Sequence, residues 1–170
     1  MVIEYRGYGL SSGIPTSKSF HNDSIHTFDS VCIQLNKLSY IGNTIVMGRS
    51  LGSVAACFIA AKRSSLIKAC IIESGFATED FFFNLVNIKK SQFETFGNLE
   101  SIKKYNKPLL VIHSLDDHIV PFNQAELLYD SACSNNKYLY KIENANHNNI
   151  IVVEKEKYFN TIKAFYDSII

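Results

Sequence analysis

The 170-residue sequence lacks the long apolar run that a transmembrane helix requires. Its longest uninterrupted apolar stretch, Val54 to Ala61, is far shorter than the ~20 residues that span a bilayer. It also lacks an excess of charge of either sign, because 17 Lys and Arg residues accompany 16 Asp and Glu residues. No basic block exceeds a pair of adjacent residues, so the charge pattern of a nucleic-acid binder is missing. With 46% hydrophobic and 12% aromatic residues, the composition instead predicts one globular domain over residues 1–170.

Cysteine is scarce and shows no metal-binding pattern. The four cysteines have no CxxC or comparable spacing, and three of them lie in apolar stretches, where free thiols commonly pack in a core. The first residues also lack a secretory signal, because Glu4 and Arg6 fall where a signal peptide needs apolar residues. We therefore expect a cytoplasmic protein with reduced thiols and no bound metal.

Short β-rich runs alternate with segments of helical periodicity. Apolar residues from Ile25 to Leu38 recur every three or four residues and predict an amphipathic helix. The runs that predict strands are Val2–Tyr5, Thr44–Met47, Ala69–Ile72, Leu109–Ile112 and Tyr138–Ile142. Further helices are expected at about Leu51–Ala61, Pro121–Cys133 and Ile150–Ile170. This alternation predicts an α/β fold with a doubly wound, mostly parallel sheet of about five strands. Ligands of such sheets bind beyond the carboxyl ends of the strands.

The segment at about residues 76–106 shows no clear strand and is rich in phenylalanine. Its phenylalanine cluster comprises Phe81, Phe82, Phe83, Phe93 and Phe96. We interpret it as a short lid-like segment whose aromatic side chains suit an acyl or other apolar group. Ordinary core packing of these rings is the alternative.

The strongest local motif is Gly48-Arg-Ser-Leu-Gly52, a G-x-S-x-G pattern between a predicted strand and a predicted helix. A nucleophile elbow at such a junction presents a serine hydroxyl above the sheet, and its tight turn favours glycine on both sides. Ser50 is therefore the candidate nucleophile, and the N–H of Leu51 is the candidate oxyanion donor. The alternative is that Ser50 merely caps the following helix.

A serine nucleophile requires a base, and the base requires an acid that orients it. Of the five histidines, only His147 follows the last predicted strand in a loop near the C-terminus. Asp116 and Asp117 follow the fourth predicted strand, at the same edge of the expected sheet. The chain order Ser50, Asp117, His147 is the order of the triad in α/β-hydrolases. The alternative is a solvent-exposed histidine beside two solvated carboxylates.

Four blocks of the sequence resemble the α/β-hydrolase superfamily, near the serine aminopeptidase-like and Bem-type hydrolases that include protein depalmitoylases. These blocks are Glu4–Gly13, Gly48–Ser53, His113–Pro121 and Asn146–His147. The resemblance implies a serine hydrolase that cleaves an ester, thioester or amide through an acyl-enzyme. The family pattern H-G-x-x-D-x-x-V-P places the acid at Asp117 rather than Asp116. The resemblance further implies a small-molecule or acylated substrate and no metal or organic cofactor.

The sequence also departs from that superfamily at its beginning. Three strands that precede this region in the superfamily have no counterpart here, nor does the His-Gly motif that supplies a second oxyanion N–H. We therefore expect a fold without its first three strands and weak turnover by the chain alone, with any membrane contact depending on a segment before Met1. The competing hypotheses are a truncated, non-catalytic hydrolase-like protein and a flavodoxin-like binding module. The second of these leaves the elbow and His147 unexplained.

Overall fold

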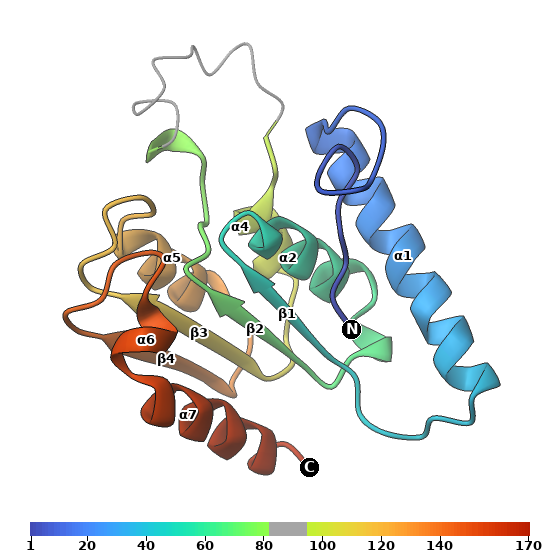
Figure 1. Ribbon diagram of the computed structural model, residues 1–170. Coiled ribbons are helices and arrows are strands. Elements are labelled where there is room, and N and C mark those ends of the chain that lie inside the picture. Colours follow the sequence, from blue (N-terminus) through green and yellow to red (C-terminus); the bar gives the residue numbers. More distant parts are fainter. Residues whose placement is uncertain (82–94) are drawn as a thin grey trace.

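The computed structural model describes residues 1–81 and 95–170, and the strands in this part of the chain form one parallel sheet (Figure 1). The strands are β1 (Ile45–Arg49), β2 (Ala69–Glu73), β3 (Leu109–Ser114) and β4 (Lys137–Ile142), paired in the order β1-β2-β3-β4. Every residue of β2 and β3 is buried, as expected for the apolar central strands of a parallel sheet. The register of β1 and β2 places Arg49 beside Glu73 at their carboxyl ends.

Helices cover both faces of this sheet. On one face lie α2 (Gly52–Lys62), α4 (Asn98–Ile102) and α5 (Asn123–Ser131), with α1 (Ser17–Lys37) packed against α2. Their apolar side chains share one core with Ile72 and Val111. The other face is covered by α6 (Ile150–Val153) and α7 (Lys155–Asp167), whose Tyr158 and Phe165 pack on Ile71 and Leu110. A short 3-10 helix, η1 (Ser64–Leu66), joins α2 to β2. The doubly wound α/β fold is thus confirmed.

Two of the expected elements are wrong. Val2–Tyr5 is not a strand, so the sheet of the described residues has four strands rather than about five. The ring of Tyr5 instead stacks on Phe20 of α1, with centroids 4.1 Å apart, so this segment packs on a helix. The expected helix Ile150–Ile170 is divided at Glu154, whose carboxylate accepts hydrogen bonds from the Tyr140 hydroxyl and the Lys157 ammonium.

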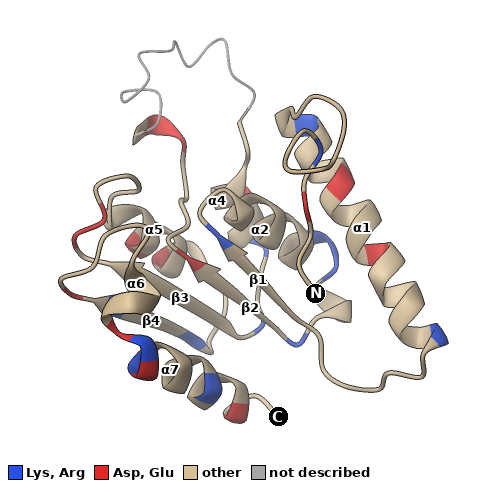
Figure 2. Cartoon of the chain, viewed as in Figure 1, with Lys and Arg blue, Asp and Glu red and all other residues tan. Residues whose placement is uncertain are grey.

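Charged side chains of both signs are interspersed along the helices. Figure 2 shows basic and acidic residues following one another on α1 and on α7. In residues 1–81 and 95–170, no helix is long and apolar enough to cross a membrane. The expected lid-like segment lies partly outside the described residues, which include Phe81 and Phe96 but not Phe82, Phe83 or Phe93.

Candidate active site

Ser50 lies in a sharp turn between β1 and α2. Its φ of 50° is in the left-handed region, which costs a non-glycine residue roughly 1–3 kcal/mol and is maintained only by its surroundings. Two hydrogen bonds maintain it here: the Ser50 N–H donates to the Glu73 carbonyl at 2.9 Å, and the Ser53 N–H donates to the Ser50 carbonyl at 2.9 Å. Because Ser50 directly follows β1, its hydroxyl lies at the carboxyl edge of the sheet, as the motif predicted.

The two glycines of the motif have different roles. A Cβ on Gly48 would lie 2.3 Å from the Gly52 carbonyl oxygen and 2.7 Å from the Ala56 Cβ, so Gly48 lets α2 approach β1. A Cβ on Gly52 would meet only the Tyr5 hydroxyl, at 3.9 Å, among the described residues. Space therefore requires glycine at position 48, as expected for a tight turn, but not at position 52.

The structure brings Ser50, His147 and Asp117 together from three loops at this edge. Nε2 of His147 is 2.8 Å from the Ser50 Oγ, and Nδ1 of His147 is 2.7 Å from Oδ2 of Asp117. An ionised carboxylate only accepts hydrogen bonds, so Nδ1 of His147 donates to Asp117, and an unprotonated Nε2 accepts a hydrogen bond from the Ser50 hydroxyl. His147 and Asp117 are each 5% exposed, and Ser50 is half-buried.

Asp117 is held ionised by its hydrogen bonds. Burial by itself would raise its pKa, but donors from His113, the Val120 N–H, His147 and the Ile119 N–H lower that pKa to about 2. Oδ1 accepts the Ile119 and Val120 N–H groups at 2.9 and 2.8 Å. Asp116 is exposed and accepts one N–H, from Asn144, at 2.9 Å. Of the two adjacent carboxylates, therefore, only Asp117 contacts His147.

We expect the Asp117 carboxylate to stabilise the fold in a pH-dependent way. Its folded pKa of about 2 lies below the unfolded value of about 3.9, so its contribution is complete above the unfolded pKa and is lost as the pH falls through the folded pKa. Asp117→Asn lowers the free energy of unfolding, and we expect this loss to be about 1 kcal/mol smaller at pH 3 than at pH 6. Urea titrations of both proteins at the two pH values would measure it, and a constant difference would contradict this expectation.

An apolar cavity of about 400 Å³ opens beside Ser50. Its apolar and aromatic lining comes from Tyr8, Leu51, Phe76, Phe81, Phe96, Ile119 and Val120. Glu79 also lines the cavity, and its carboxylate accepts the Phe96 N–H at 2.5 Å and the Thr95 hydroxyl at 3.1 Å. Among the described residues, no main-chain carbonyl accepts a hydrogen bond from the N–H of Leu51, which follows Ser50.

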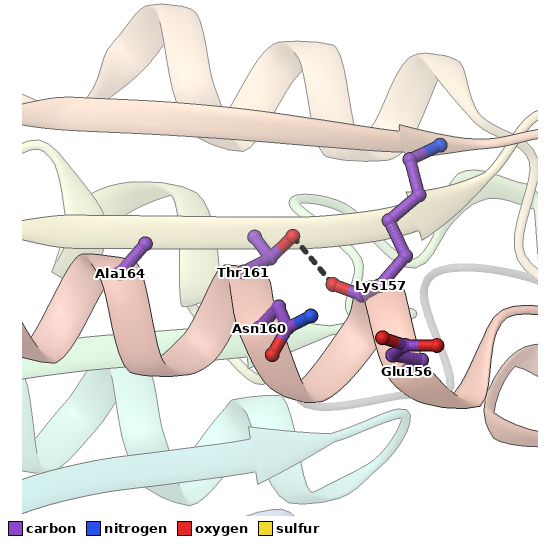
Figure 3. A pocket seen from close by; sticks show the side chains of 5 residues that line it. All are labelled: Glu156, Lys157, Asn160, Thr161 and Ala164. Atoms are coloured by element: carbon purple, nitrogen blue, oxygen red, sulfur yellow. Dashed lines mark hydrogen bonds between the residues drawn. The ribbon is translucent and has the colours of Figure 1, made fainter.

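A second hollow lies on α7 and involves none of these residues. It is lined by Glu156, Lys157, Asn160, Thr161 and Ala164, and the Thr161 hydroxyl donates to the Lys157 carbonyl at 2.8 Å (Figure 3). No group of three or more His, Cys, Asp or Glu residues suited to a metal ion occurs in the described part of the chain.

Sequence reasoning gave no role to three residues that contact this site. His113 is fully buried, and its Nε2 donates to the Val120 carbonyl at 2.9 Å and lies 3.4 Å from Oδ2 of Asp117. Arg49 and Glu73 pair at 3.1 Å beside Ser50. Arg49 occupies a variable position of the G-x-S-x-G motif, and Glu73 ends a buried apolar strand. The charge of Glu73 at the end of an apolar strand was the one sequence feature that could have indicated a role at this site.

A parallel sheet covered by helices on both faces, with a serine elbow at its carboxyl edge, is the fold of the α/β-hydrolase superfamily. The family model of the prolyl oligopeptidase family matches residues 30–170, and the chain belongs to that family. Among solved structures, the esterase Pf2001 of Pyrococcus furiosus has the same fold, with a TM-score of 0.77 at 18% identity over 97% of this chain and 68% of that one.

Two curated relatives match nearly the whole chain. The chain is 28% identical over 165 residues to alpha/beta hydrolase domain-containing protein 17B of Homo sapiens. This alignment covers 95% of this chain and 54% of that protein. It is also 28% identical over 173 residues to the uncharacterized membrane protein YNL320W of Saccharomyces cerevisiae, over 96% of this chain and 59% of that protein. The chain thus spans little more than half the length of these relatives.

Proposed function

We propose that this chain carries the active site of a serine hydrolase that cleaves an ester, thioester or amide bond through an acyl-enzyme. The observation that carries the proposal is the continuous hydrogen-bonded series from Asp117 through His147 to Ser50. The position of Ser50 on a strand-to-helix elbow supports it, because this turn exposes a hydroxyl to substrate.

Each residue has a defined role in the proposed reaction. The Ser50 Oγ attacks the substrate carbonyl carbon while its proton passes to Nε2 of His147. Asp117 stays ionised and stabilises the imidazolium, and the Leu51 N–H donates to the oxyanion of the tetrahedral intermediate. His147 then returns the proton to the leaving alcohol, thiol or amine. Water, activated by the same histidine, hydrolyses the acyl-enzyme and frees Ser50.

The cavity beside Ser50 supports a substrate with an apolar portion. Its volume of about 400 Å³ is within the roughly 300–1,000 Å³ of typical small-molecule sites, and aromatic and aliphatic side chains make most of its wall. We therefore propose an acylated or other small-molecule substrate whose apolar group lies against Phe76 and Val120. We also propose a cytoplasmic location and contact with a membrane surface.

Covalent labelling with a fluorophosphonate probe tests the proposed function. The probe phosphonylates an activated serine, so we expect one adduct per chain, on the peptide that contains Ser50. Ser50→Ala should abolish the adduct, and Ser65→Ala, which removes an exposed hydroxyl elsewhere, should leave it unchanged. Equal labelling of Ser50→Ala would refute Ser50 as the nucleophile. No labelling of the wild-type chain would instead favour a non-catalytic hydrolase-like protein.

A further inference from the structure

Arg49 precedes Ser50 in the elbow, and its guanidinium links three parts of the fold. Nε donates to Oε1 of Glu73 at 3.1 Å. Nη2 donates to the main-chain carbonyl of His147 at 2.5 Å and to Oδ1 of Asn148 at 3.2 Å. One side chain therefore connects the ends of β1 and β2 to the loop that carries the candidate base.

Glu73 anchors this guanidinium. The residue is 2% exposed, and it lies beside Arg49 in the parallel register of β1 and β2. Its second carboxylate oxygen accepts the Tyr158 hydroxyl of α7 at 2.6 Å, so both oxygens are bound. Its main-chain carbonyl accepts the Ser50 N–H. Figure 2 shows the oppositely charged ends of β1 and β2 side by side. Glu73 thus binds the elbow through its backbone and Arg49 through its side chain.

The loop that carries His147 crosses the carboxyl edge of the sheet, and the contact with Arg49 fixes its far end. It leaves β4, which lies at the opposite edge of the sheet from β1, yet the His147 ring must reach Ser50 after β1. The start of the loop is bound to the end of β3, since the Ala145 carbonyl accepts the Ser114 hydroxyl. Further along, Arg49 alone among the described residues binds the main chain of His147.

The bonds to Asp117 and Ser50 orient the imidazole ring, whereas the bond to Arg49 places the backbone from which the ring extends. The paired Glu73 carboxylate also offsets the positive charge of Arg49. That charge would otherwise oppose formation of an imidazolium on His147. Arg49 therefore positions the His147 backbone without adding a net positive charge that would disfavour the imidazolium.

We propose that Arg49, anchored on Glu73, is a positioning residue that places His147 for proton transfer with Ser50. This inference rests on the proposed function. A displacement of about 1 Å in a catalytic group can lower a rate by about 10²-fold, so Arg49→Met should slow the reaction of Ser50 by roughly 10–100-fold.

The rate constant for fluorophosphonate labelling of the full chain tests the proposal. Arg63→Met is the matched control, because Arg63 makes a two-bond ion pair with Asp29 at 2.8 and 2.7 Å, away from the triad. We expect Arg63→Met to label at the wild-type rate and Arg49→Met to label roughly 10–100-fold more slowly. In a His147→Ala background, Arg49→Met should cause no further loss, because Arg49 acts through His147. A wild-type rate in Arg49→Met, or an equal loss in the His147→Ala background, would overturn the proposal.

A second measurement follows the hydrogen-bonding state of the His147 ring and does not depend on labelling or turnover. Long-range ¹H–¹⁵N NMR spectra of the imidazole nitrogens, assigned by comparison with His147→Ala, should show the Nδ1-protonated tautomer in the wild-type chain and in Arg63→Met. Arg49→Met should show a mixture of tautomers, since the ring no longer keeps both partners. An unchanged His147 spectrum in Arg49→Met would overturn the inference. Failure of the wild-type chain to label would count against the proposed function, and the spectra would still decide the role of Arg49.

Discussion

Replacement of Asp117 by Asn is expected to lower kcat by about 10⁴-fold. An Asn amide turned toward His147 donates a hydrogen bond to Nδ1, so Nδ1 must be unprotonated and the ring proton lies on Nε2. In that tautomer Nε2 no longer accepts the proton of the Ser50 hydroxyl. The loss is large because Asp117 is buried and contacts Nδ1 at 2.7 Å, where solvent does not replace the carboxylate.

Asp116→Asn is the matched control for this experiment. The Asp116 carboxylate is exposed and binds the Asn144 N–H, so its replacement should change kcat by no more than about threefold. Hydrolysis of a p-nitrophenyl ester, expressed relative to the wild-type chain, measures both variants even where turnover is weak. Circular dichroism would show that both are folded. The reverse ranking of the two variants would make Asp116 the acid.

Replacement of Gly48 by Ala is expected to destabilise the fold by about 3 kcal/mol, at the upper end of the usual cost of overpacking. The added methyl carbon would lie 2.3 Å from the Gly52 carbonyl oxygen, and both this backbone and the Ala56 Cβ belong to α2. Because neither neighbour is the end of a flexible side chain, the whole helix must move away from β1. That movement would also displace Ser50.

Gly52→Ala provides the comparison at the other end of the motif. A methyl group there meets only the Tyr5 hydroxyl among the described residues, at 3.9 Å, so its free energy of unfolding should change by less than about 1 kcal/mol. Urea denaturation followed by circular dichroism measures both variants. If Gly48→Ala proved as stable as Gly52→Ala, the close approach of α2 to β1 would not be what requires glycine at position 48.

Features of this protein that depend on contiguous residues could be predicted from the sequence, and features that depend on distant contacts could not. The elbow could be predicted because Gly48, Ser50 and the flanking strand and helix are contiguous in sequence. The mistaken strand at Val2–Tyr5 has the same origin, since its local pattern says nothing of whether a neighbouring strand exists. In the structure the Tyr5 ring stacks on Phe20 of α1 instead. The catalytic roles of Ser50, Asp117 and His147 remain a prediction that labelling and kinetics must test.

Local patterns in the sequence were enough to predict the alternation of strands and helices, the elbow, and the placement of Ser50, Asp117 and His147 after strands that end at one edge. Hydrophobic periodicity and turn chemistry are properties of short segments, and the carboxyl ends of parallel strands necessarily share an edge. The burial of Asp117 against His147 and the exposure of Asp116, in contrast, depend on how the strands and loops pack in three dimensions. The position of Arg49 between Glu73 and the His147 carbonyl depends on the same packing. These contacts join residues up to 98 positions apart, and they depend on strand register and loop path, which no local pattern encodes.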